Sequence, residues 1–242
     1  MTMQLNPVTR GDLRSRLSSP KILWGLRVYV AALGVLAVFA LPPESGRIPG
    51  LSEAELVPLF LVAQLVAVAY FTSALAVGEV GVEGEKDILD LAVTGFAPRT
   101  IALGKLWTAA CFAAALVLVA LPLVALVAPP DPAALPALGR ALGVTILLAV
   151  PLAVVGTWLG AAVSSDFLRT MLHWSFFLGV YAATRWLADP LVLLNPLRLV
   201  TAAYRGTPPG WPLALVPHLV MAAVGTGLIA RRVTSVRHEG AA

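Results

Sequence analysis

Residues 79–105 read EVGVEGEKDILDLAVTGFAPRTIALGK and lie between two long apolar runs, 56–78 and 106–130. Five of the thirteen carboxylates in the chain fall between positions 79 and 90: Glu79, Glu83, Glu85, Asp87 and Asp90. The stretch from Glu83 to Val93 is rich in helix formers. A charged helix held between two membrane spans, on one side of a bilayer, predicts a docking element or a gate.

Outside this segment the chain is dominated by charge-free apolar runs. Of its 242 residues 59% are hydrophobic and 12% are charged, whereas a soluble domain carries about a quarter charged residues. A hydrocarbon core about 30 Å thick needs roughly 20 helical residues to cross it. The runs and their flanks therefore predict an all-α polytopic membrane protein with six spans, at 22–41, 56–78, 99–128, 134–163, 168–187 and 211–230.

Lysine and arginine set the expected orientation. With six spans, twelve of the seventeen basic residues fall on the side that carries both termini and five on the other side. Cytoplasmic loops carry such an excess, so we expect both termini in the cytoplasm and the protein in the cell inner (plasma) membrane. The net charge of +4 then reflects topology and contact with lipid headgroups, and it predicts no nucleic-acid partner.

Two segments outside the spans are also expected to be helical. Asn6 is a good N-cap and Pro7 suits a first helical turn, so residues 5–19 predict a basic helix lying in the cytoplasmic interface. Residues 188–212 are too rich in proline to span and too apolar for an exposed loop. They predict two short helices, 190–194 and 196–204, that re-enter the outer leaflet before the last span.

The acidic segment itself predicts a helix over 82–94. Glu83, Asp87 and Asp90 are spaced three or four apart, on a face opposite the apolar side chains. One interpretation is a cytoplasmic lever that a partner protein pushes. The other is a solvated loop helix without a partner.

Particular motifs carry a resemblance to a known family. They are Glu83-x-Glu85, Leu89-Asp90-Leu91, Thr94, Pro98, Ile101 and Gly104-Lys105. This series resembles the ABC-2 class of transporter permeases, in which an acid pair opens a helix after the second span and a Gly-Lys pair enters the third. Asn6-Pro7 followed by a basic helix is similar to the N-terminal connecting helix of many members, and the resemblance in residues covers 83–105 and, loosely, 5–17.

The resemblance implies a permease subunit of an ATP-driven exporter, paired with ABC ATPase subunits and a second permease copy. It implies that the segment 82–94 is a coupling helix that rests on the ATPase, through Glu83, Glu85, Asp87, Leu89, Asp90, Leu91 and Thr94. Gly104 and Lys105 would form the entry to span three. No G-x-x-x-x-G-K-[ST] phosphate loop occurs in the sequence, so we expect no cofactor in this chain, with ATP and Mg²⁺ bound by the partner.

Few polar residues fall inside the predicted spans. Gln64 lies in mid-span, where its amide can bond across the bundle or line a path, while His173 and His218 lie nearer span ends. Aromatic residues gather on spans two and five. We expect a translocation path for a lipid, drug or small peptide along Gln64, Tyr70, Phe71, Trp174 and Phe177, although each aromatic side chain could equally face lipid or pack the bundle.

Other function classes have less support in the sequence. Carriers coupled to protons or sodium place carboxylates or broken helices near the midplane, and here no Asp or Glu lies centrally. The three histidines are scattered and Cys111 is the single cysteine, so neither a metal site nor an enzyme is expected. The main alternative is a non-transporting membrane scaffold or assembly factor. Gly156 and Gly160 form one GxxxG pair that could permit close helix packing.

Overall fold

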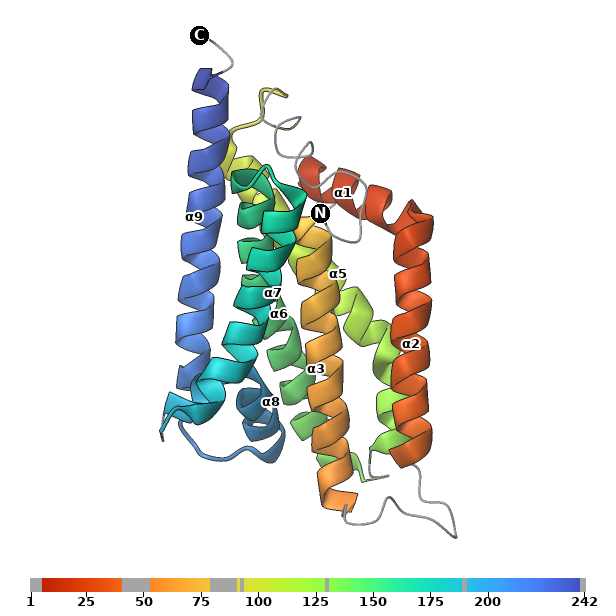
Figure 1. Ribbon diagram of the computed structural model, residues 1–242. Helices are drawn as coiled ribbons and strands as arrows, with labels where there is room; N and C mark the ends of the chain where they lie inside the picture. Colours follow the sequence, from red (N-terminus) through yellow and green to blue (C-terminus); the bar gives the residue numbers. More distant parts are fainter. Residues whose placement is uncertain are drawn as a thin grey trace, which may run out of the picture.

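The computed structural model describes residues 6–40, 53–78, 91, 94–128, 131–188 and 191–239. Every regular element in these ranges is a helix and none is a strand, which confirms the predicted all-α class (Figure 1). The elements are α1 (Pro7–Ser18), α2 (Pro20–Ala40), α3 (Glu53–Val77), α5 (Pro98–Val127), η1 (Pro132–Ala134), α6 (Leu135–Ala162), α7 (Asp166–Ala182), η2 (Ala183–Trp186), η3 (Leu191–Leu194), α8 (Pro196–Arg205), η4 (Trp211–Leu215) and α9 (Val216–Glu239).

Within the described ranges, five helical segments have the length and apolarity of membrane spans. Three of them lie within α2, α3 and α5. The fourth consists of η1 with α6, and the fifth consists of η4 with α9. The segment predicted as the fifth of six spans differs, because α7 has 17 residues and a length of about 25 Å. A turn of 3-10 helix, η2, continues it to Trp186. The six-span layout therefore stays a prediction, whereas the membrane-protein character is supported by the five longer segments.

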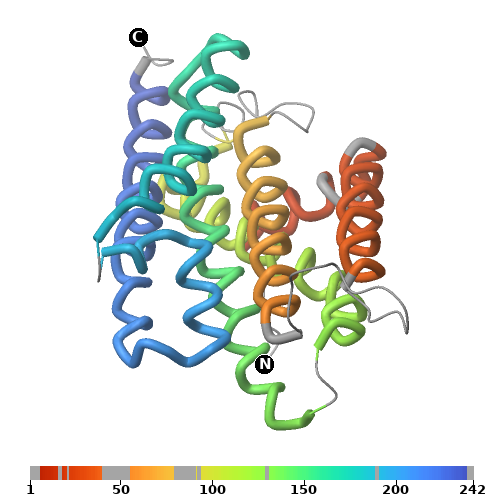
Figure 2. Tube along the Cα trace, turned by 60° about the horizontal axis from the view of Figure 1, so that its bottom comes forward, coloured from red at the N-terminus to blue at the C-terminus, as the bar shows by residue number. Residues whose placement is uncertain are grey.

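The long helices stand side by side and alternate in direction. In Figure 1, α2, α5 and α7 run toward one end of the bundle, and α3, α6 and α9 run back. Helix α1 crosses the end where α9 finishes, and α8 lies at the opposite end. Figure 2 shows α3, α5 and α6 in the middle, with α2 on one flank and α7 and α9 on the other.

The centre of the bundle is the packing of α3 against α6. Gly156 allows the two helices to approach closely, because a Cβ atom at this position would lie 2.8 Å from the carbonyl oxygen of Ser73. At Gly160 a Cβ atom would lie 3.4 Å from the carbonyl oxygen of Val77. The GxxxG pair thus brings the two backbones together, as its sequence suggested. Leu61, Leu65, Val68, Leu148 and Leu152 fill the core beside this contact.

Prolines lie inside three of the long helices and at the start of a fourth. Pro122 and Pro151 lie inside α5 and α6, and Pro58 lies inside α3. Pro217 occupies the first turn of α9, where the missing amide hydrogen breaks no helical bond. Helix α9 also continues to Glu239, past the predicted end of its span at residue 230.

The broken segment before α9 packs on the bundle. The two short helices expected at 190–194 and 196–204 correspond to η3 and α8. Asn195 caps α8, since its Oδ1 accepts from the Leu197 amide at 2.9 Å. Leu199, Val200 and Ala203 of α8 are fully buried. The expected entry of this segment into the outer leaflet stays a prediction.

Candidate functional site

The first candidate region joins α1 to the start of α5, and it begins at Asn6. The Asn6 Oδ1 atom accepts from the Val8 amide at 3.0 Å, which makes Asn6 the predicted N-cap of α1. Its Nδ2 atom donates to the carbonyl oxygen of Thr100 at 3.0 Å. One side chain therefore both starts α1 and fixes it to α5.

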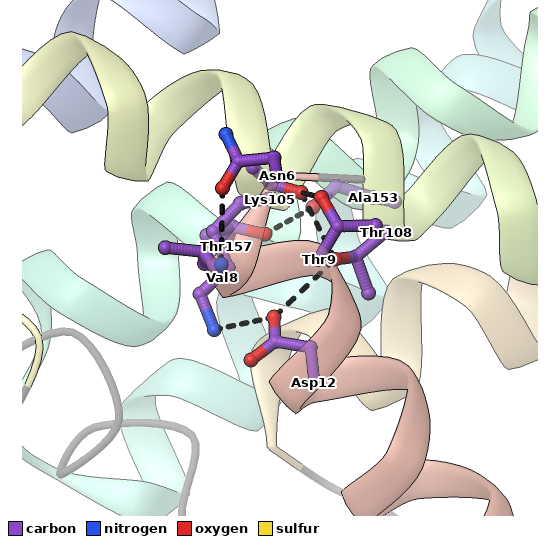
Figure 3. A network of polar contacts seen from close by, with 9 residues as sticks. Asn6, Val8, Thr9, Asp12, Lys105, Thr108, Ala153 and Thr157 are labelled. Atoms are coloured by element: carbon purple, nitrogen blue, oxygen red, sulfur yellow. Dashed lines mark hydrogen bonds and ion pairs between the residues drawn. The ribbon is translucent and has the colours of Figure 1, made fainter. Parts of the chain in front are cut away.

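A buried ion pair lies one turn further along α1. The Lys105 Nζ atom is 2.8 Å from Asp12 Oδ2, and the two side chains are 4% and 10% exposed. The Thr108 Oγ1 atom lies 3.4 Å from the same carboxylate oxygen, and its hydroxyl donates to the Gly104 carbonyl at 2.9 Å. Figure 3 shows these groups converging from α1 and α5. Because each charge is shielded from water, each requires the other.

Gly104 explains why α1 can lie so close to α5. A Cβ atom on Gly104 would lie 2.7 Å from Val8 Cβ, which is closer than carbon atoms can approach. The carbonyl oxygen of Gly104 accepts from the Thr9 hydroxyl at 3.0 Å. Gly104 and Lys105, predicted as the entry to span three, therefore act as a contact point and a counter-ion for α1 in the structure.

Sequence reasoning missed Asp12 and Thr9 as members of this cluster. The available signal was spacing: Val8 and Asp12 are four residues apart, so they share one helix face with Thr9 beside them. The acid would face inward on a helix whose exposed side carries Arg10 and Arg14. We name the set Asn6, Val8, Thr9, Asp12, Gly104, Lys105 and Thr108 the α1–α5 clamp.

The predicted coupling residues lie mostly outside the described residues. This holds for Glu83, Glu85, Asp87, Leu89 and Asp90. Leu91 is described and packs against the cluster formed by Val8, Ile101, Val154, Ile229 and Val233 of α1, α5, α6 and α9.

A turn connects Leu91 to α5. Thr94 is exposed, and its amide donates to the Leu91 carbonyl at 3.2 Å. Gly95 has a φ of +77°, a conformation that favours glycine. Arg237, near the end of α9, donates to the carbonyl oxygen of Phe96. The residues that lead into α5 therefore contact the last turns of α9.

The second candidate region is an aromatic cluster between α3 and α7. The Tyr70 ring lies 5.1 Å from Trp174 and 5.9 Å from Phe177, measured between centroids. The Phe71 ring lies 5.7 Å from the Tyr70 ring and, on α2, 6.0 Å from the Tyr29 ring. Four of the predicted path residues thus lie in one connected group, with Trp174 37% exposed at its edge.

Gln64 has a different setting from the aromatic residues predicted with it. Its side chain is fully buried, and neither Nε2 nor Oε1 has a hydrogen-bond partner. It lies near the Tyr29 hydroxyl without reaching hydrogen-bond geometry; that hydroxyl donates to the Leu116 carbonyl at 3.1 Å. A fully buried amide lines no open path in this conformation.

His173 and His218 make different bonds. His173 Nε2 lies 2.9 Å from the Ser73 hydroxyl and joins α7 to α3. His218 Nδ1 lies 3.1 Å from the Ala214 carbonyl, and its ring also faces the backbone of Leu194 in η3. Among the described residues no three His, Cys, Asp or Glu side chains gather as a metal site would need.

The two candidate regions therefore offer contacts that hold α1 to α5 and an aromatic cluster with an exposed edge. Comparison of the chain with protein-family models gave no match, and comparison with curated proteins gave none either.

Proposed function

We propose that this chain is the permease subunit of an ABC-2 type exporter, driven by separate ATPase subunits and paired with a second permease copy. The observation that carries the proposal is the α1–α5 clamp. Residues 5–17 and 83–105 are the two segments that resemble this family, and they meet there through Asn6, Asp12, Gly104 and Lys105. Two distant segments that resemble one family also form one contact.

The α1–α5 clamp could transmit a movement of the coupling segment to the rest of the helix bundle. Asp12 and Lys105 hold α1 to α5 across 93 positions of sequence, while Leu91 joins the apolar cluster at the same end. That cluster includes Ile229 and Val233 of α9. A push on residues 82–94 by a partner would therefore reach α5, α1 and α9 together.

The aromatic cluster suits the proposed substrate class. Tyr70, Trp174 and Phe177 form an aromatic cluster between α3 and α7 with the Trp174 ring exposed at its edge, and rings of this kind bind apolar and amphipathic molecules. We propose that a lipid, drug or small peptide passes beside this surface. The energy would come from ATP and Mg²⁺ bound in the partner, because the chain carries no phosphate-binding loop.

The test of this proposal is purification of the tagged chain from its native membrane in a gentle detergent. The eluate is identified by mass spectrometry and assayed for ATP hydrolysis. A stoichiometric ATPase with vanadate-sensitive turnover is the expected result. Recovery of the chain alone, or with proteins that lack ATPase activity, would overturn the proposal and favour a membrane scaffold.

A charge reversal tests the coupling segment directly. The double change Glu83→Lys and Glu85→Lys should abolish coupled ATP hydrolysis, because it reverses the acid pair expected to meet the ATPase, while membrane insertion is retained. Asp131→Lys is the control, since Asp131 is exposed at the far end of α5. Coupled turnover that survives the double change rules out this segment as the coupling helix.

A further inference from the structure

An apolar cavity of about 80 Å³ lies between α2, α3 and α5. One water molecule needs roughly 10–15 Å³ of such space, so the cavity is large enough for several. Its lining is entirely apolar, however, with Leu23, Phe71, Leu75, Ala115 and Val119 among the side chains. A cavity without polar partners does not hold ordered water, so its natural occupant is hydrocarbon.

The cavity opens toward the surface of the bundle that would face lipid. Leu23 and Val119 line it and are 41% and 43% exposed. Gly25 lines it too, and the ring of Phe71 would lie 3.2 Å from a Cβ atom placed there. The missing side chain at Gly25 thus lets the Phe71 ring pack directly against α2 at the cavity wall. A chain of methylene groups could enter from the bilayer without displacing a helix.

Several residues place the cavity near one membrane interface. Its α2 side belongs to the first turns of that helix, directly after α1, and its α3 side belongs to the last turns of α3. Its α5 side, from Phe112 to Val119, belongs to the middle of α5, so the cavity extends from this end of the bundle toward its middle. Trp24 is 66% exposed on α2. Exposed tryptophans mark the headgroup level of a bilayer, so the mouth of the cavity lies close to that level.

A cation lies beside the mouth. Arg27 is one helical turn after Leu23, on the same side of α2, and it is exposed. It forms no hydrogen bond or ion pair with the part of the chain that the structure describes. Helical side chains lean toward the helix N-terminus, which directs the guanidinium of Arg27 toward the interface. Arg10 and Arg14 add exposed positive charge at the same end.

We propose that this cavity is a binding site for an anionic phospholipid that belongs to the structure rather than to the transported cargo. One acyl chain enters between α2, α3 and α5, and Arg27 binds the headgroup phosphate. The site adjoins the aromatic cluster between α3 and α7, because Phe71 lines the cavity and its ring contacts Tyr70 of that cluster. It requires a membrane location but does not depend on the proposed export function.

The test is native mass spectrometry of the purified full-length chain, titrated in detergent with dioleoyl phosphatidylglycerol and, in parallel, dioleoyl phosphatidylcholine. We expect one phosphatidylglycerol per chain, bound more tightly than phosphatidylcholine. Arg27→Gln should weaken binding of phosphatidylglycerol about fivefold, as expected for loss of one interfacial cation. Arg99→Gln, which removes an exposed arginine from the start of α5, should leave it unchanged.

A second pair of variants tests the acyl chain. Ala115→Leu fills the cavity from α5 and should reduce the binding of both lipids, while Ala125→Leu, on an exposed position of the same helix, should not. Glycerol 3-phosphate, which has headgroup chemistry without an acyl chain, should not compete. Equal binding by wild type and both site variants, or displacement by glycerol 3-phosphate, would overturn the proposal.

Discussion

At the scale of single residues, Lys105 carries the largest expected effect on stability. Lys105→Met removes the cation that neutralises Asp12, whose side chain is 10% exposed. Breaking a buried pair from one side costs about 3–5 kcal/mol, so the apparent melting temperature in detergent should fall clearly. The measurement is thermal unfolding followed by tryptophan fluorescence.

The double variant Asp12→Leu with Lys105→Met separates charge from packing. Replacing a whole buried pair with apolar residues is often neutral, so this variant should recover most of the lost stability. Arg14→Gln, an exposed position of α1, is the control and should leave the melting temperature unchanged. A double variant as unstable as the sum of its single changes would show that the ion pair is not the source of the effect.

Gly156 is a second position where a small change in one side chain should lower the stability of the protein. Gly156→Ala would place a methyl group 2.8 Å from the Ser73 carbonyl oxygen, so α3 and α6 must separate, at a cost of about 1–3 kcal/mol. Gly143→Ala on the same helix meets nothing within 4 Å and should be neutral or slightly stabilising, because alanine favours helix. Similar melting temperatures for the two variants would contradict the close contact.

At the scale of elements, α7 is held by a narrow seam. Its buried residues are Arg169, His173, Phe177 and Tyr181, spaced four apart. The Ser73 hydroxyl proton is directed to backbone carbonyls of α3, so the Nε2–H of His173 donates to its oxygen. His173→Leu removes this bond between helices, and amide hydrogen exchange should rise across residues 166–182.

His218 supplies the matched control for that experiment. Its two backbone partners, Ala214 and Leu194, both lie outside α7, so His218→Leu should leave exchange in α7 at the wild-type level. Hydrogen exchange with mass spectrometry in detergent measures both variants. An α7 that exchanges equally in the His173 variant and in wild type would show that ring packing alone holds it.

The long helices could be predicted because the sequence signal is local. A charge-free run of sufficient length identifies α3, α5 and α6 within a few residues. Helix ends beyond the apolar surface were harder to predict. Arg231 and Arg232 follow the last apolar run, yet α9 continues beyond them to Glu239. There Arg232 Nε donates to the Ala161 carbonyl at 3.2 Å.

The clamp was beyond sequence reasoning for a different reason. Asp12 and Lys105 are 93 positions apart, and no local pattern shows that two such charges meet. The separation of α7 from η2 was equally hidden, because Ala182 and Ala183 offer no break in composition. Contacts among Tyr70, Trp174 and Phe177 could be expected in outline from their helices, whereas the burial of Gln64 depends on packing around α3.

At the scale of the whole molecule, whether α7 crosses the bilayer determines on which side of the membrane each end of the chain lies. If α7 crosses the bilayer, the start of α1 and the end of α9 lie on one side; if it does not, they lie on opposite sides. In Figure 1 the two ends occupy the same end of the bundle, and twelve of the seventeen basic residues fall on that side in the six-span layout. We therefore expect both ends in the cytoplasm.

Single cysteines in a Cys111→Ser background test this topology, because a membrane-impermeant maleimide labels intact cells from outside. The positions Asp131→Cys and Thr207→Cys, both exposed, should react in intact cells, since each lies in a predicted outer loop. Arg14→Cys and His238→Cys should react only after permeabilisation. Were α7 to remain on the cytoplasmic side, Thr207→Cys would lose its labelling and His238→Cys would gain it. Two positions would then change together, so a five-span chain cannot reproduce the pattern expected of six.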